Sequence, residues 1–142
     1  MNAWIVYAVA AAILYGVHQV FTKLASSGAS EGLGGLIVEA TATATIGVYL
    51  LWLRWAGPWE QHLNGHGAVY SLATGICVGA GTIAFFLLFQ AGGPLSAVPA
   101  VLALGSAIMV AAGIVLFRES WSWQQALGVI LSIAAILLLK RA

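Results

Sequence analysis

Residues 92–139 read GGPLSAVPAVLALGSAIMVAAGIVLFRESWSWQQALGVILSIAAILLL and decide the fold class of the chain. They contain two apolar runs, 96–117 and 123–139, which only a few residues separate. A connection this short makes the two predicted helices antiparallel neighbours. The first run is rich in small residues, and close packing at small residues holds helices together in lipid, where no hydrophobic force acts between them. The segment therefore predicts a membrane-embedded hairpin, without ionisable groups inside its helices, that serves as scaffold and interface.

The composition of the whole chain also indicates a membrane protein. Its 142 residues are 62% hydrophobic and only 6% charged, whereas a soluble domain has about 25% charged residues. No basic cluster points to nucleic acid, and the lone Cys77 lies in an apolar run, so no disulfide framework is expected. The first apolar run has no Lys or Arg before it and is longer than a signal-peptide core of about 7–15 residues. We therefore expect it to remain as a span.

The lengths of the apolar runs predict the number of spans. A helix needs about 20 apolar residues to cross a hydrocarbon core about 30 Å thick. On this scale the sequence predicts an all-α integral membrane protein with five transmembrane helices in a single domain, 1–142. The predicted helices are 4–25, 31–55, 68–91, 96–117 and 123–139.

Several residues are typical of helix ends. Gly28 is a candidate left-handed cap of the first helix, and Ser30 is a candidate N-cap of the second. Ser122 and Gln125 fit a capping box at the start of the fifth helix. Pro99 lies in the first turn of the fourth helix, where a missing N–H costs little, or kinks that helix if it begins at residue 94.

The orientation in the membrane is weakly encoded. Five spans put the two termini on opposite sides and bring all six Trp residues to the N-terminal side, in keeping with the preference of indole for the interface. The positive-inside rule needs a bias in Lys and Arg, and the two sides are nearly balanced. Two alternatives stay open: a single orientation set by the terminal Lys-Arg pair on the cytoplasmic side, or dual topology with antiparallel pairing. The N-terminal side holds Arg54 and Arg118, and the other side holds Lys23, Lys140 and Arg141.

Two ionisable residues lie well inside predicted spans, where such residues are costly and indicate function. Glu39 lies about eight residues into the second helix, and His18 about six residues before the end of the first. Both fall at a similar depth, about 5–8 Å from the midplane, and could meet. Polar and small residues flank them on one face of each helix, which predicts a face turned to the bundle or to a water-filled cavity. The functional hypothesis is a substrate or proton site made by Tyr15, His18, Gln19, Glu39 and Thr43.

The other polar motifs have simpler interpretations. Gly75-x-x-x-Gly79 predicts close packing of the third helix, with a hinge as the alternative. Glu60, His62 and His66 suggest a metal site, but no further ligand of fixed spacing accompanies them, so we expect a solvated loop. No nucleophile–base arrangement is present either. We therefore expect neither a metal nor another cofactor, and no enzymatic activity.

Two stretches carry a resemblance to a known family. The first stretch is the run from Ala91 to Pro99, with the helix that ends Leu116-Phe117-Arg118-Glu119 and the following Gln125-x-x-Gly128. The second consists of the first-span residues Tyr15-Gly16 and Phe21-x-Lys23. With these motifs the chain resembles an EamA-like repeat, the five-helix building block of the drug/metabolite transporter superfamily. Members usually fuse two repeats in opposite orientations around a central cavity, which gives ten helices. This chain has one repeat.

The resemblance implies a half-size secondary transporter of small organic metabolites or drugs that works by alternating access, with proton coupling as an option. Inverted repeats need opposite orientations and five is an odd number of spans, so a second copy in an antiparallel homodimer would supply the other half. A parallel homodimer or a separately encoded partner half is the alternative. We expect a multi-pass protein of the prokaryotic plasma membrane.

Two departures from related proteins concern the charged residues. Small multidrug resistance proteins carry a membrane carboxylate in the first helix, where this chain has His18, and many EamA-like repeats carry an arginine near the position of Glu39. A glutamate in the cavity favours a cation or a proton as its ligand. The competing hypothesis is a non-transporting membrane assembly or lipid-handling subunit, in which Glu39 and His18 form a structural pair.

Overall fold

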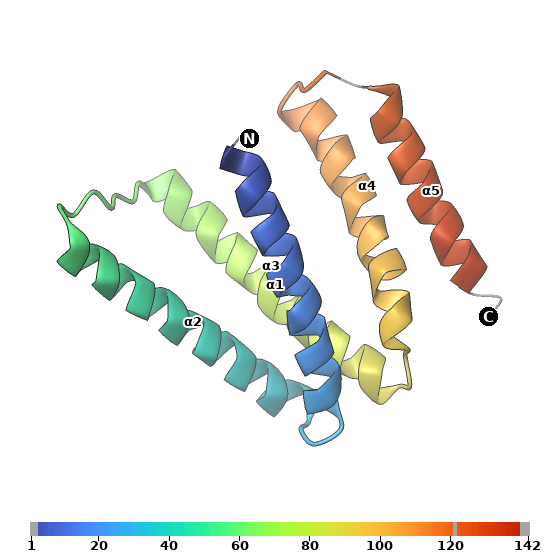
Figure 1. Ribbon diagram of the computed structural model, residues 1–142, viewed down its shortest axis with the longest axis horizontal. Helices are drawn as coiled ribbons and strands as arrows, with labels where there is room; N and C mark the ends of the chain where they lie inside the picture. Colours follow the sequence, from blue (N-terminus) through green and yellow to red (C-terminus); the bar gives the residue numbers. More distant parts are fainter. Residues whose placement is uncertain (1–2, 121, 140–142) are drawn as a thin grey trace. The chain divides into compact units, whose positions relative to one another are not determined.

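A computed structural model describes residues 3–120 and 122–139, which form five α-helices and a short 3-10 helix (Figure 1). The predictions for Trp121, Lys140 and Arg141 lie outside these residues. The chain divides into two compact units, Met1–Gly92 and Gly93–Ala142. The single domain 1–142 stays a prediction.

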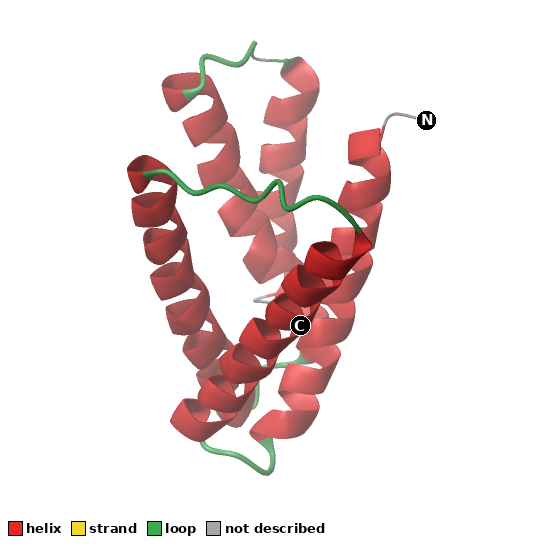
Figure 2. Ribbon diagram, turned by 90° about the vertical axis from the view of Figure 1, so that its left-hand side faces the viewer, coloured by secondary structure: helices red, strands yellow, loops and turns green. Residues whose placement is uncertain are grey.

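The first unit contains three long helices: α1 (Ala3–Ser26), α2 (Glu31–Ala56) and α3 (Gly65–Gln90). Helix α3 packs against both others, whereas α1 and α2 contact each other little. The amide of Gln90, the last residue of α3, donates to the carbonyl of Ala29 at 3.0 Å and ties this end of α3 to the α1–α2 turn. Figure 2 shows α2 and α3 diverging from that turn toward the loop 57–64. The three helices are therefore joined tightly at one end and open at the other.

The packed end of the first unit depends on two glycines in α2. A Cβ at position 34 would come within 2.6 Å of Phe86 Cζ, and Phe86 has no exposed surface. At Gly35 a Cβ would be in ordinary contact with Ile83 and Thr82. Missing side chains at these two positions let α2 approach α3 and let the Phe86 ring lie directly on the backbone of α2.

The second unit is a helical hairpin. The 3-10 helix η1 (Leu95–Ala97) leads into α4 (Val98–Leu116), which packs against α5 (Trp123–Leu139). Pro99 lies in the first turn of α4, so the first of its two predicted placements is confirmed. The chain reverses at Arg118, whose φ of 54° lies in the left-handed region that residues other than glycine seldom adopt.

The capping box and the N-cap position of Ser30 are confirmed, and the predicted left-handed cap at Gly28 is wrong. Gln125 N–H donates to Ser122 Oγ at 3.3 Å and Ser122 N–H donates to Gln125 Oε1 at 2.8 Å, so the capping box is present. Ser30 occupies the N-cap position of α2, but its side chain caps no N–H. Gly28 does not have the positive φ of a left-handed cap, which Gly92 has instead, at 86°.

The helix ends lie close to the predicted ones, but the number of spans differs from the prediction. Four segments are long and apolar enough to cross a membrane: Ala3–Ser26, Glu31–Ala56, Gly65–Gln90 and Leu95–Leu116. They fit an integral, multi-pass membrane protein. The fifth predicted span is not among them, because α5 has 17 residues. At 1.5 Å per residue it is about 26 Å long, which is less than the hydrocarbon thickness of about 30 Å.

Candidate functional site

The candidate site begins at the carboxylate of Glu39 on α2. Thr82 Oγ1, on α3, donates to Glu39 Oε1 at 2.6 Å. Thr82 is 5% exposed, and Glu39 is half-buried. The short distance is typical of a hydroxyl that donates to a carboxylate. Gly35, one helical turn before Glu39, lies against Thr82, whose Cγ2 would be 3.8 Å from a Cβ placed on Gly35. The glycine and the glutamate thus share the face that α2 turns to α3.

Thr82 is the residue that the sequence analysis missed. Its position one turn before Phe86 places it on the buried face of α3, together with Phe89. A threonine on the buried face of an apolar helix needs a hydrogen-bond partner, and it commonly uses the carbonyl one turn back in its own helix. Thr22, Thr43 and Thr74 do this. Thr82 binds Glu39 instead, and no local pattern distinguishes it from the other threonines.

Helix α1 contributes two polar side chains with unpaired atoms. His18 is half-buried and Gln19 is 7% exposed. His18 Nδ1 and Gln19 Oε1 are buried and have no hydrogen-bond partner among the described residues. Buried polar atoms are rarely left without a partner, because an unmade hydrogen bond costs about 1–3 kcal/mol. Both atoms are therefore available to a ligand, a water molecule or a second chain.

The predicted meeting of His18 and Glu39 does not occur. Within the part of the chain that the structure describes, no hydrogen bond or ion pair joins the two side chains. The reason is the order of packing, since α3 contacts both α1 and α2 while these two contact each other little. The carboxylate therefore takes its hydrogen bond from α3. A His–Glu pair that locks α1 to α2 is not present.

The two remaining predicted site residues are exposed. Tyr15 is 66% exposed and touches His18 edge-on, with ring centroids 6.3 Å apart. Thr43 is exposed, and its hydroxyl donates to the backbone carbonyl of Glu39 at 2.9 Å. The structure thus brings Glu39 together with Thr82, and His18 together with Tyr15.

Lys23, in the last turn of α1, places a positive charge against α3. Lys23 Nζ is 5.0 Å from the centroid of the Phe89 ring, within the range of a cation–π contact. Phe89 and Phe86 lie one turn apart on the buried face of α3. The aromatic face of α3 therefore contacts α2 through Phe86, and the Lys23 ammonium group lies over its Phe89 ring.

The loop that suggested a metal site is exposed. Glu60, His62 and His66 all have exposed side chains. Among the described residues, no three His, Cys, Asp or Glu side chains are grouped closely enough to hold a metal ion.

Comparison of the chain with protein-family models, with curated proteins and with solved structures finds no match in any of the three. The resemblance to an EamA-like repeat is therefore untested and stays a prediction.

Proposed function

We propose that this protein is a half-size secondary transporter that moves small organic molecules across a membrane as an antiparallel homodimer, with Glu39 as the group that binds a proton or a cationic substrate. The observation that carries the proposal is a carboxylate inside an apolar helix whose only hydrogen bond in the described structure comes from one threonine hydroxyl, at 2.6 Å. Ionisable groups at membrane depth are costly and mark ion or substrate pathways.

The depth of Glu39 supports this role. It lies eight positions after Glu31, the first residue of α2, which corresponds to about 12 Å along the helix. Binding sites of secondary transporters lie near the bilayer midplane, where access from either side can alternate. A carboxylate at this depth can exchange a proton for a cationic substrate and so couple the two movements.

Polar groups on α1 and α2 leave hydrogen-bonding capacity for a ligand. Glu39 Oε1 accepts from Thr82, and acceptor sites on the carboxylate remain. His18 Nδ1 and Gln19 Oε1 on α1 have no partner among the described residues. A substrate that carries N–H donors, such as an organic amine, would satisfy these acceptors.

The need for a second copy follows from the exposure of the helices. The first unit buries few side chains, and long apolar faces of α1, α2 and α3 are exposed. Three diverging helices do not enclose a cavity. In the proposal a second, inverted chain closes it, and α5 acts as the fifth span, which 17 residues permit at the lower end of the spanning range of about 17–25.

The test uses purified protein in liposomes with an internal pH indicator and the cationic dye ethidium as a probe substrate. We expect the wild-type chain to take up dye in response to a proton gradient. The Glu39→Gln variant, which keeps the shape and an acceptor for Thr82 but cannot carry a proton, is expected to abolish coupled uptake while staying folded. Glu60→Gln is the matched control, because Glu60 is a carboxylate in an exposed loop.

Three outcomes would contradict the proposal. Full proton-driven uptake by Glu39→Gln would remove Glu39 from the mechanism. Absence of any proton or dye flux at every pH, with Glu39→Ala lowering only thermal stability, would favour a non-transporting assembly or lipid-handling subunit. A reporter at the C-terminus that is found only in the cytoplasm would exclude the antiparallel homodimer.

A further inference from the structure

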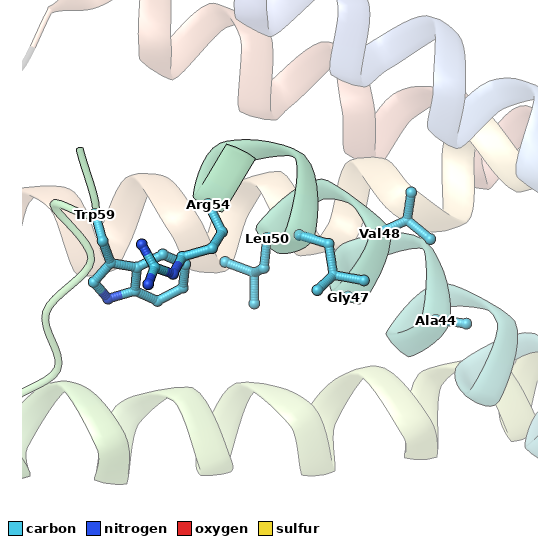
Figure 3. A pocket seen from close by; sticks show the side chains of 7 residues that line it. Ala44, Gly47, Val48, Leu50, Arg54 and Trp59 are labelled. Atoms are coloured by element: carbon cyan, nitrogen blue, oxygen red, sulfur yellow. The ribbon is translucent and has the colours of Figure 1, made fainter. Parts of the chain in front are cut away.

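A groove runs along the second half of α2 and begins five positions after Glu39. Its volume is about 770 Å³, within the range of about 300–1,000 Å³ that is typical of sites for small molecules. Figure 3 shows the labelled side chains in a row, with Ala44 at one end and Arg54 and Trp59 at the other. The apolar part of the wall consists of Ala44, Gly47, Val48, Leu50 and Leu51.

The groove is apolar along most of its length and charged at one end. Arg54 is the charged residue among those that line it. Its side chain is exposed, and it forms no ion pair or hydrogen bond with any other described residue, including Glu60 of the following loop. A guanidinium group without a partner is suited to bind a phosphate through two parallel N–H bonds. The chemistry of the lining therefore matches a molecule with an apolar chain and an anionic end.

The length of the groove matches one leaflet of a bilayer. The ten positions from Ala44 to Arg54 correspond to about 15 Å of helix, which is half of a hydrocarbon core of about 30 Å. Trp and Arg favour the interface between hydrocarbon and water. With Arg54 and Trp59 at that interface, Ala44 lies near the midplane. An acyl chain that starts from a headgroup at Arg54 would thus follow the apolar wall to the middle of the bilayer.

Gly47 makes the middle of the groove deep enough for such a chain. No neighbouring atom lies within 4 Å of a Cβ placed on Gly47. Gly75 and Gly79 on α3 are likewise open, with no atom within 4 Å of a Cβ placed there, and Figure 2 shows α2 and α3 diverging toward the loop 57–64. Side chains of this unit therefore do not fill the space beside α2 at this level.

We propose that this groove is a binding site for an anionic phospholipid, with one acyl chain along the apolar wall from Ala44 to Leu51 and the phosphate on Arg54. Charge complementarity and the one-leaflet length select this occupant. The inference is independent of transport and of the role of Glu39.

The first experiment measures lipids that stay bound to the purified protein by native mass spectrometry, with phosphatidylglycerol and phosphatidylcholine as probes. We expect preferential retention of phosphatidylglycerol. Arg54→Gln is expected to weaken that binding about fivefold, the equivalent of about 1 kcal/mol for one cation at a membrane surface. Arg118→Gln is the matched control, because Arg118 is another exposed arginine at a helix end and does not line the groove.

The second experiment fills the groove. Gly47→Leu places a side chain in open space and is expected to displace both phospholipids, whereas Gly16→Leu, an equally open glycine on α1, is expected to displace neither. Equal binding of the two lipids, or unchanged binding by Arg54→Gln, would overturn the proposal. Competition by inorganic phosphate alone would show a simple anion site. Loss of dimers in Gly47→Leu with unchanged lipid binding would show that a second copy of the chain occupies the groove.

Discussion

Both ends of the α2–α3 pair contain glycines, but the two helices are in close contact at only one end. At the end next to the α1–α2 turn, Gly34 and Gly35 bring α2 onto Phe86 and Thr82. Toward the loop 57–64, Gly75 and Gly79 in the middle of α3 have no neighbouring atom within 4 Å of a Cβ, and Gly47 on α2 is equally open. Both ends are rich in small residues. Only one of them is a helix–helix contact within the described chain.

The difference shows that glycine permits close approach without causing it. In lipid, two helices associate through van der Waals contact and hydrogen bonds at small residues. The packed end has all of these: an aromatic ring that covers Gly34, a hydroxyl that binds Glu39, and an amide that ties Gln90 to Ala29. The open end has glycines alone. Specific partners, and not the Gly-x-x-x-Gly spacing, hold α2 to α3.

The largest expected effect comes from adding a methyl group at the packed end. Gly34→Ala would place a Cβ against the Phe86 ring, and overpacking of this kind costs about 1–3 kcal/mol. The measurement is unfolding by increasing concentrations of a denaturing detergent, with tryptophan fluorescence as the signal. The double variant Gly34→Ala/Phe86→Leu is expected to recover part of the loss. Wild-type stability of Gly34→Ala alone would show that α2 and α3 are not in contact there.

A smaller effect is expected from removing the hydrogen bond between the helices. Thr82→Val keeps the shape of the side chain and leaves Glu39 Oε1 without its donor. We expect a loss of about 1–2 kcal/mol, because hydrogen bonds to charged groups are strong but those within membranes average less. Thr74→Val is the control, since the Thr74 hydroxyl donates only to the Tyr70 carbonyl of its own helix. Equal losses in the two variants would contradict a special role for Thr82.

At the open end, the start of α3 depends on a cap and not on α2. The Asn64 side chain accepts from the N–H of Gly67 at 2.7 Å. Asn64→Ala is expected to cost about 1 kcal/mol or less, and the loss is confined to the first turn of α3. Faster hydrogen exchange at residues 65–68, with unchanged exchange around Phe86, is the expected result. Faster exchange along the whole of α3 would show that the two ends are coupled.

The smallest effects are expected at the open glycines. Gly75→Ala and Gly79→Ala add a methyl group where nothing is in contact, so each should change the unfolding free energy by no more than about 0.5 kcal/mol or stabilise the helix slightly. The same fluorescence measurement as for Gly34 applies. A loss as large as that of Gly34→Ala would mean that a second chain packs on these glycines.

The features that could be predicted from the sequence are local ones. Ser122 and Gln125 form the predicted capping box because both groups that bond lie within one turn of chain. Pro99 lies in the first turn of α4 because its missing N–H is tolerated there. The apolar runs form helices close to the predicted ranges. The fifth span stays a prediction, because the described α5 has 17 residues and the length of a helix, and not only its apolar character, limits what it can cross.

The ionisable residues of the candidate site could be predicted from the sequence, but their partners could not. Glu39 and His18 attract attention because each is an ionisable residue in an apolar run, a property of the sequence. Their partners depend on which helix lies beside which. Thr82 binds Glu39, and Tyr15 and Thr43 are exposed. No periodicity within α1 or α2 indicates that α3 contacts both of them.

The sequence by itself determined a helical membrane protein with two ionisable residues inside its helices, because the cost of placing charges and unpaired backbone in lipid acts residue by residue. The tertiary structure decided that α3 packs between the polar faces of α1 and α2, that Gly34 and not Gly75 is a contact, and that a groove lies open beside Gly47. The physical reason is that no hydrophobic force drives apolar helices together in lipid, so their pairing depends on a few side-chain contacts between distant segments.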